Sequence, residues 1–227
     1  FMGQEDRAHA LLDAAAAGKT QLRLSSAFPF CGEVLYLPAP LTAGTGSESE
    51  LVPWSRFAAW ARGEPSDSRR PADPEAFARE LHFAPDAGLY FLADVDEKVL
   101  PRRAFEQELA VLGREGIGGG RSAGAGAFEP ETSKLPEGFS ELLAGTGDAW
   151  VTLSLFHPGP DVPTDLGPLA YKLVLREGRI ASSSAEESLP RKTTSMFAEG
   201  SVFRTRPQGA WLDVTPAGFD AHRVWRS

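Results

Sequence analysis

The chain has 227 residues, of which 42% are hydrophobic and 24% are charged, and its formal net charge at pH 7 is −8. This length suits one large domain or two small ones, and the acidic balance argues against a protein that coats nucleic acid unselectively. A single cysteine, Cys31, excludes an intrachain disulfide framework and a multi-thiolate zinc site, and no apolar run is long enough to cross a bilayer. We therefore expect a reducing, cytoplasmic location with no membrane partner, and no metal or other cofactor, because the four histidines lack ligand-like spacing.

The N-terminal part of the chain mixes helical periodicity with short strand-like runs. Alanines and leucines at helical spacing predict a first helix that ends at Gly18. Pro38 and Pro40 after the second strand are typical of a sheet edge, because proline donates no ladder hydrogen bond. The predicted elements are a helix over Gln4–Ala17, a strand over Leu22–Leu24, a loop over Ser25–Phe30, a strand over Glu33–Leu37, an amphipathic helix over Pro53–Arg62 and a strand over Gly88–Leu92.

The C-terminal part favours one helix and then several strands. Pro101 suits the first turn of a helix, whose apolar face begins with Ala104 and Phe105 and which we expect Gly113 to end. The predicted strands that follow are Ala125–Phe128, Trp150–Phe156, a hairpin of Leu169–Leu175 with Gly178–Ala181 around Glu177–Gly178, Met196–Ala198, Val202–Arg204 and Trp211–Val214. This order predicts an α+β fold in two halves, each a sheet backed by one or two helices.

The stretch from Gly113 to Phe128 contains seven glycines around one Arg-Ser pair. Glycine accepts positive φ and has no Cβ, so such a run lets main-chain N–H groups face a ligand at close range. Phosphate is the usual ligand of such a surface, and Arg121 and Ser122 add a guanidinium and a hydroxyl that suit phosphate oxygens. The alternative is a flexible surface linker. The candidate RNA-binding residues of this loop are Gly116, Ile117, Gly118, Gly119, Gly120, Arg121, Ser122 and Gly124.

Three enzyme motifs fit this loop poorly. A Walker A loop fails because Glu115 and Arg121 replace its first glycine and its lysine. A dinucleotide-binding turn fails because the glycines follow a predicted helix where the motif requires a strand. The segment Gly120–Gly124 is a literal G-x-S-x-G, with Asp213 and His222 later in the order of a hydrolase triad, but a nucleophile elbow joins a strand to a helix. A serine hydrolase therefore remains a weak alternative.

Positive charge also gathers at the C-terminal end. The segment from Pro190 to Ser227 has six basic and three acidic residues. This distribution is expected of a protein that grips a short stretch of nucleic acid with a limited surface. Arg191 and Lys192 are therefore candidates for the RNA backbone, and the alternative is that they form the solvated end of a hairpin.

Two aromatic residues near the N-terminus are candidates for stacking a splayed RNA base. Phe28 and Phe30 are preceded by Ser25 and Ser26, and RNA-binding modules commonly stack unpaired bases on aromatic rings. Phenylalanines more often belong to the core, so both interpretations stay open. No catalytic residue is assigned.

Several segments together resemble the RAMP subunit family of type III-A CRISPR effectors, the fourth subunit of the Csm complex. The glycine-rich segment and the Arg191 segment are specific in combination. The segments that carry the resemblance are Leu112–Gly126, Arg191–Phe203, Asp213–Pro216 with His222–Val224, Ser25–Phe30 and Leu37–Leu41. The family normally opens with a strand and a helix start that are absent here, so we expect a missing N-terminal segment, and its aromatic tail is shortened.

The resemblance implies two ferredoxin-like (RRM-like) domains, residues 1–92 without the first strand and helix start, and residues 93–227 with the glycine-rich loop 113–128. It implies no catalysis, and capture of the crRNA 5′ handle. The implied partners are the large polymerase-like Csm subunit and the backbone RAMP subunit. A related RAMP endoribonuclease that processes crRNA is the alternative, with His222 as its candidate acid or base.

Overall fold

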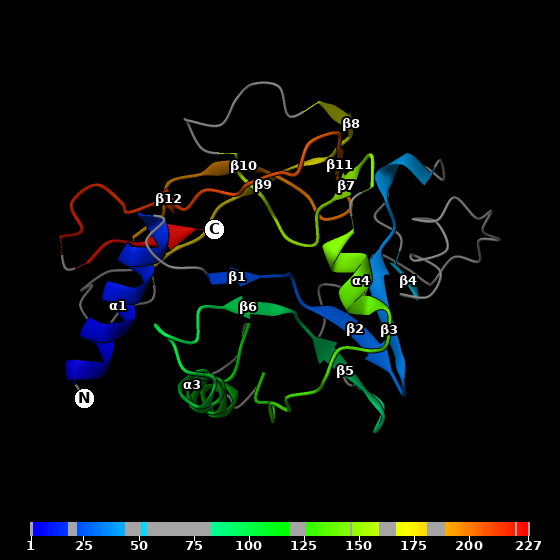
Figure 1. Cartoon of the computed structure of the whole chain (residues 1–227). Helices are drawn as coiled ribbons and strands as arrows, with labels where there is room; N and C mark the ends of the chain where they lie inside the picture. Colours follow the sequence, from blue (N-terminus) through cyan, green and yellow to red (C-terminus); the bar gives the residue numbers. More distant parts are fainter. Residues whose placement is uncertain are drawn as a thin grey trace.

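A computed structural model describes residues 2–17, 22–43, 51–53, 83–118, 126–145, 147–158, 167–180, 189–220 and 222–226. The fold is mixed α/β, and all described strand pairings are antiparallel (Figure 1). The elements are α1 (Met2–Ala16), β1 (Leu22–Leu24), β2 (Phe28–Cys31), β3 (Val34–Pro38), the 3₁₀ turn η1 (Leu41–Ala43), β4 (Leu51–Pro53), β5 (Ala87–Tyr90), β6 (Ala93–Val95), α3 (Arg102–Glu115), α4 (Phe139–Ala144), β7 (Trp150–Val151), β8 (Pro168–Ala170), β9 (Leu173–Arg176), β10 (Thr194–Phe197), β11 (Val202–Phe203), β12 (Leu212–Asp213) and β13 (Trp225–Arg226).

The N-terminal sheet has the order β4-β3-β2-β5 and forms one face of the main core. Inward-facing Phe28, Leu37 and Val52 are each at most 4% exposed. Phe139, the first residue of α4, is fully buried in the same cluster. The half-buried Tyr90 hydroxyl donates a hydrogen bond of 2.7 Å to the carbonyl of Tyr36, and burial raises the pKa of Tyr90. This sheet is therefore fixed by apolar side chains on its inner face.

The helix α3 lies beside the short pair β1-β6, as Figure 1 shows with α3 seen nearly end-on below β6. Phe105 of α3 packs edge-on against Phe91, with 6.4 Å between ring centroids. Pro101 stands immediately before the first helical residue, where its missing N–H costs nothing. The pairing of β1 with β6 crosses the boundary expected between residues 92 and 93, which stays a prediction.

The described C-terminal strand pairs are all antiparallel. The strands form a sheet of order β7-β11-β8 and a separate pair β10-β9. Between them, the Ala198 N–H, just after β10, donates to the carbonyl of Lys172, just before β9, at 2.8 Å. Phe203 is fully buried, and Met196 is 1% exposed. The two halves meet where the Leu41 N–H donates to the Gly200 carbonyl at 2.9 Å.

Several local predictions were wrong. The predicted loop Ser25–Phe30 contains most of β2. Pro29 does not interrupt this strand, because Pro29 pairs only with β5, and β3 pairs with Phe30 and Cys31. β3 lies inside its sheet and not at the edge, since Pro38, at its end, faces Leu51 of β4. No strand occupies the described part of the predicted strand Ala125–Phe128.

The predicted hairpin at Glu177–Gly178 is also wrong, because β9 pairs with β10, far along the chain. The strand predicted over Trp150–Phe156 is broken after Val151, and Phe156 keeps only an isolated bridge to Phe197. β4, β6, α4 and β13 were not predicted. The predicted helix Pro53–Arg62 lies outside the described residues, except for Pro53, which belongs to β4.

Candidate nucleic-acid interface

The glycine-rich loop leaves the C-terminal end of α3 through a hydrogen-bonded neck. The Gly116 N–H donates to the Leu112 carbonyl at 2.8 Å as the helix ends. The Ile117 N–H donates to the Gly126 carbonyl at 2.9 Å, and the returning Phe128 N–H donates to the Gly113 carbonyl at 3.0 Å. We call these six residues the loop neck; it fixes both ends of the loop.

Two glycines of the loop neck are required by close backbone approach. A Cβ on Gly126, which has φ +77°, would lie 1.9 Å from the Ile117 carbonyl oxygen. A Cβ on Gly113 would lie 2.3 Å from the carbonyl oxygen of Phe128. Gly113 was expected to end α3, but it is a buried helical residue on which the returning chain packs. Its role is therefore close packing, and the helix runs on to Glu115.

Gly118 differs from these two glycines. It has φ +83°, and a Cβ built on it would meet nothing within 4 Å. Positive φ alone makes glycine favourable here, and the space beside it is open. Gly116, Ile117 and Gly118 thus lie at the start of the predicted binding loop. The other loop candidates, Gly119, Gly120, Arg121, Ser122 and Gly124, lie outside the described residues.

Ser25 and Ser26 hold neighbouring segments together, and Ser26 links the two halves of the fold. The Ser25 hydroxyl accepts from the Leu92 N–H at 2.9 Å, and the Ser26 N–H donates to the Leu153 carbonyl at 2.9 Å. The Ser26 hydroxyl donates to the Glu199 carboxylate. These groups are used within the protein, so both serines have a structural role in this fold, and their contact with RNA stays a prediction.

Phe28 is placed in the core. It is 4% exposed, and its ring lies 6.1 Å from that of Tyr90. A base cannot reach a ring that is buried on both sides, so the core interpretation, and not base stacking, fits the described fold. Phe30 is half-buried, and its ring lies over Gly88 of the neighbouring strand, where a Cβ would come within 2.8 Å of it.

Arg191 belongs to a group of arginines that the sequence pattern only partly indicated. Arg226 of β13 reaches back to the end of β9, where its Nη1 donates to the Arg176 carbonyl at 2.6 Å and its Nη2 to the Glu177 carbonyl at 3.1 Å. Arg191 Nε donates to the Arg179 carbonyl at 3.2 Å. We call Arg176, Arg191 and Arg226 the arginine cluster.

The arginine cluster concentrates positive charge. Burial, followed by repulsion from Arg191 and Arg176, lowers the pKa of Arg226. Within the described part of the chain, no carboxylate forms an ion pair with any of the three. The guanidinium groups of Arg191 and Arg226 are instead positioned by carbonyl oxygens, which hold them without neutralising them. Such a site is suited to an anion with several oxygen acceptors, such as phosphate.

Lys192 points to a different neighbourhood. Its backbone N–H donates to the Val214 carbonyl at 3.2 Å, and its ammonium contributes to the lowered pKa of Asp213. Hydrogen bonds from Thr215 are the larger cause of that shift. Lys192 is exposed and extends the positive surface beyond Arg191.

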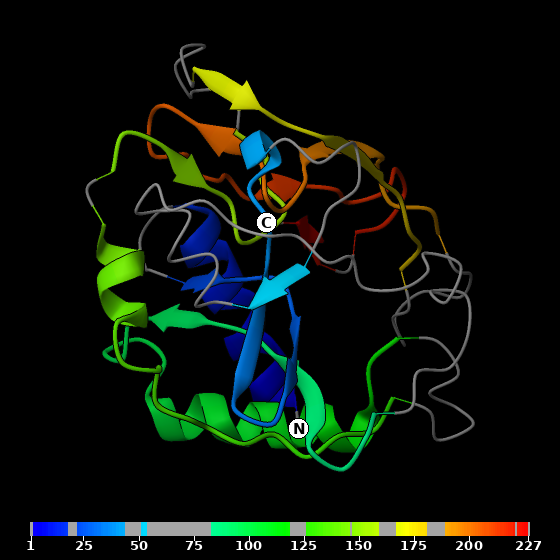
Figure 2. The same ribbon diagram turned by 90° about the vertical axis from the view of Figure 1, so that its right-hand side faces the viewer.

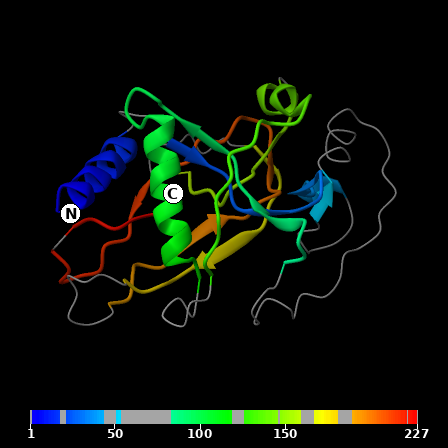
Figure 3. The ribbon, with the colours of Figure 1, turned by 90° about the horizontal axis from the view of Figure 1, so that it is seen from below.

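In Figure 1, α3 and β9 lie on opposite sides of the pair β1-β6. Along the length of α3, Figures 2 and 3 both place its C-terminal end, from which the glycine-rich loop leaves, toward the side of the molecule where β9 ends. The loop neck and the arginine cluster come from segments far apart in sequence. A single ligand that contacts both must therefore extend past the pair β1-β6.

The hydrolase and nuclease candidates are not assembled into a catalytic group among the described residues. The His222 ring stacks on His9 at 4.4 Å between centroids and meets Phe219 edge-on at 4.9 Å. Asp213 accepts a hydrogen bond from the Thr215 N–H at 3.0 Å and lies 4.0 Å from Arg223. Ser122 lies outside the described residues. His222 is thus packed between rings, as expected of a structural histidine.

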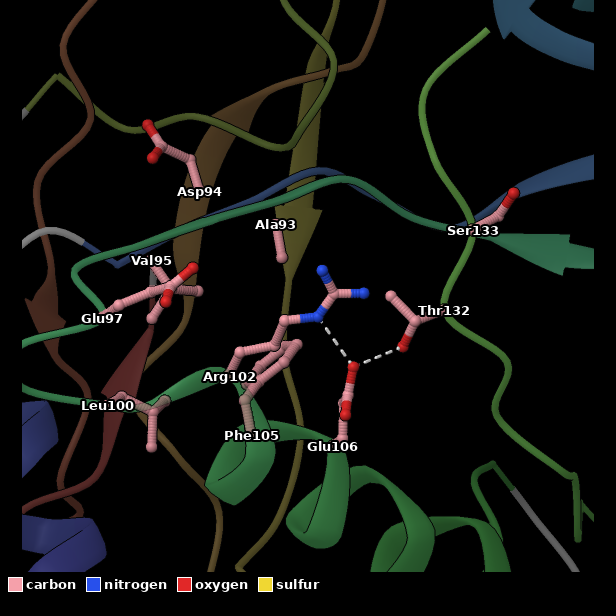
Figure 4. A pocket seen from close by; sticks show the side chains of 10 residues that line it. All are labelled: Ala93, Asp94, Val95, Glu97, Leu100, Arg102, Phe105, Glu106, Thr132 and Ser133. Atoms are coloured by element: carbon pink, nitrogen blue, oxygen red, sulfur yellow. Dashed lines mark hydrogen bonds and ion pairs between the residues drawn. The ribbon is translucent and has the colours of Figure 1, made fainter.

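A polar pocket of about 370 Å³ opens beside the N-terminal end of α3 (Figure 4). Arg102 Nε donates to Glu106 at 2.9 Å, and the Thr132 hydroxyl donates to the same carboxylate at 3.0 Å. The hydrogen bond from Arg102 holds the pKa of Glu106 below its usual range. The pocket carries charges of both signs, and this pairing leaves it no net positive character for RNA.

Neither a metal centre nor a membrane-spanning helix was found where the structure can be described. No group of three or more histidine, cysteine or acidic side chains is placed to hold an ion in those segments. In the same segments, no helix has both the length and the apolar character needed to cross a bilayer.

Comparison with known proteins identifies relatives of one family. The sequence profile of the CRISPR Csm4 C-terminal domain matches residues 145–227. A protein from Mycobacterium tuberculosis, CRISPR system Cms protein Csm4, is 32% identical over 158 residues, which are 67% of this chain and 49% of that protein. The chain thus spans about half the length of this relative. A Csm4 protein from Thermococcus onnurineus is 26% identical and is covered over 75% of its length.

Solved structures of the same kind share the fold. A Csm3-Csm4 subcomplex of the type III-A CRISPR-Cas interference complex matches with a TM-score of 0.64 and 16% identity, over 98% of this chain and 87% of that chain. A Csm1-Csm4 cassette in complex with cA3 matches with a TM-score of 0.61 and 20% identity, over 97% and 79%. The profile, the relatives and the shared fold agree, and the chain belongs to the Csm4 family of type III-A CRISPR systems.

Proposed function

We propose that this chain is the RNA-holding subunit of a type III-A CRISPR effector complex, and that it captures the 5′ handle of crRNA without catalysing a reaction. Related Csm4 chains were solved together with Csm1 and with Csm3. The proposal includes docking on a large polymerase-like subunit of the Csm1 kind and on a backbone subunit of the Csm3 kind. It also includes two ferredoxin-like domains as the framework.

The arginine cluster is the observation that carries the proposal. A positive site without a paired carboxylate is costly in an isolated protein, because its like charges repel one another. Here burial and, after it, this repulsion lower the pKa of Arg226. A phosphate oxygen would relieve the repulsion, and RNA presents phosphates in a row. Phosphate contacts would position the RNA and would read no bases.

The loop neck adds a second point of contact. It leads into Gly118, which has positive φ and open space beside it, and into a loop whose sequence contains Arg121 and Ser122. A backbone phosphate that approaches such glycines meets N–H donors and no side-chain obstruction. Two separate points of contact suit an extended single strand, consistent with a handle at one end of an RNA.

The test uses the effector complex reconstituted with its partner subunits and crRNA. Arg191→Ala combined with Arg226→Ala should weaken crRNA retention by about 2–5 kcal/mol if each arginine binds a phosphate, and each phosphate left unbound should make the salt dependence shallower by about 0.7 in logarithmic slope. Arg103→Ala, an exposed arginine on α3 away from the arginine cluster, is the matched control. Equal retention and equal slopes in both variants would contradict the proposal.

A further inference from the structure

An apolar stripe runs along the strands β8 and β9 and the two residues that join them. It consists of Leu169, Tyr171, Leu173 and Leu175, which are 43%, 54%, 54% and 62% exposed. Alternate residues of an extended chain point to the same side, so the four side chains form one row. Large apolar side chains exposed in a contiguous row are unusual on a soluble protein and mark interaction sites.

The stripe lies on one well-defined face of its sheet. On the opposite face, Val174 pairs with Met196, which is 1% exposed. On the stripe side, Leu173 pairs with Phe197, and the Tyr171 ring meets the Phe197 ring edge-on at 5.4 Å. Phe197 in turn packs on Phe156 and Phe203. The stripe is therefore supported by packed aromatic rings, while Met196 is buried on the opposite face, where Lys172 and Arg176 are exposed.

The strand that carries the stripe is also an edge among the described strands. β8 pairs with β11 and β9 pairs with β10, and neither has a described neighbour on its other side. Figure 2 shows both strands running along the upper rim of the molecule. An edge that combines unpaired backbone groups with an apolar row is a template for an added extended segment.

Charge indicates what kind of segment fits. Between Pro168 and Arg176 the chain has two basic residues, Lys172 and Arg176, and no acidic one. A second copy of this chain, paired antiparallel about the centre of the stripe, would set Lys172 against Lys172, and like charges directly opposite are destabilising. An RNA strand would find one ring to stack on, Tyr171, because the branched leucines offer no flat surface.

We propose that the stripe docks an extended, apolar segment of a partner protein in which an acidic residue faces Lys172. The inference rests on the proposed place of the chain in an effector complex and adds a specific surface to it. The apolar side chains supply the affinity, the free edge supplies main-chain hydrogen bonds, and Lys172 selects against a second copy.

The test measures each partner subunit's affinity for the chain, and crRNA retention, separately in the reconstituted complex. Leu173→Glu combined with Leu175→Glu should weaken binding of one partner subunit by roughly 30-fold or more, as removal of a hot spot does. Val34→Glu is the matched control, because Val34 is 40% exposed at the start of β3. Lys172→Glu should weaken the same partner more than Lys172→Ala does.

A photo-crosslinker in place of Tyr171 covers the case in which the double variant fails to fold. A crosslink to a peptide of one partner subunit with an acidic residue beside apolar ones supports the proposal. A crosslink to RNA, a crosslink to a second copy, or unchanged partner affinity in the folded double variant overturns it. Failure of the proposed function gives a different result. The wild-type complex would then retain no crRNA, but the effect of the stripe variants on the affinity for the partner subunit could still be measured.

Discussion

The loop neck and the arginine cluster, the two regions of the proposed RNA surface, are built in different ways. In the loop neck, backbone groups lie so close together that a Cβ on Gly126 would lie 1.9 Å from a carbonyl oxygen. In the arginine cluster, the guanidinium groups of Arg191 and Arg226 donate to backbone carbonyls, and the charges of Arg191 and Arg176 act on Arg226. The first region depends on the absence of side chains, and the second on their charge.

This difference separates stability from binding. A substitution in the loop neck disturbs packed backbone and should be seen first in unfolding. A substitution in the arginine cluster removes repulsion between arginines as well as hydrogen bonds to backbone carbonyls. These two effects on stability oppose each other, so the substitution should be seen first in RNA retention. Glycine substitutions and changes of pH test this contrast, and substitution of Gly126, the glycine of closest approach, should have the largest effect.

The largest effect is expected for Gly126→Ala. Its Cβ would clash with the Ile117 carbonyl, in addition to the strain of positive φ, so we expect a loss of about 2–4 kcal/mol and a lower unfolding midpoint by roughly 5–15 °C. Gly32→Ala is the control, because Gly32 also has positive φ but has nothing within 4 Å of its Cβ. Thermal unfolding of both variants measures the difference, and equal shifts would show that close approach is not what the loop neck requires.

A smaller effect on stability is expected for Gly118→Ala. Its φ of +83° predicts a strain of about 1–2 kcal/mol, similar to that of Gly32→Ala, because a Cβ at either position meets nothing within 4 Å. The two variants should differ in crRNA retention, since Gly118 belongs to the proposed RNA surface and Gly32 does not. If Gly118→Ala retains crRNA as well as Gly32→Ala does, the start of the glycine-rich loop is not part of the RNA surface.

The smallest effect is expected for pH. Arginines stay protonated well beyond neutrality even with the lowered pKa of Arg226, so crRNA retention should be flat between about pH 6 and pH 9. The lowered pKa of Asp213, due first to Thr215, stabilises the fold above its unfolded pKa, and this stabilisation disappears as pH falls through the folded value, below this window. A step in retention within this window would instead indicate that a histidine takes part, as the nuclease alternative requires.

The fold was predictable from the sequence where local chemistry dominates. Pro101 marked the start of α3, and the strand-like runs at Leu22–Leu24 and Val202–Arg204 were confirmed. Predictions failed where distant contacts decide. Gly113 resembles a helix terminator, yet Phe128 packs on it. The turn signal at Glu177–Gly178 suggested a local hairpin, but β9 finds its partner in β10.

The candidate site was predictable in part for the same reason. The glycine pattern indicated the loop, and the positive C-terminal segment indicated Arg191. Arg176 was not predicted, because it is a lone arginine on an ordinary strand and becomes significant only when Arg226 reaches across to it. Phe28 could not be separated from a stacking residue by sequence, because core and binding phenylalanines share the same local pattern; its burial decides.

The most direct measurement of the central claim is crosslinking of crRNA in the reconstituted complex, with a photoreactive nucleotide placed in the 5′ handle or at the 3′ end. We predict that the handle nucleotide crosslinks to this chain, in peptides that contain Gly118 or Arg191, and that the 3′ nucleotide does not. Crosslinks from the handle that fall exclusively on other subunits would contradict the account.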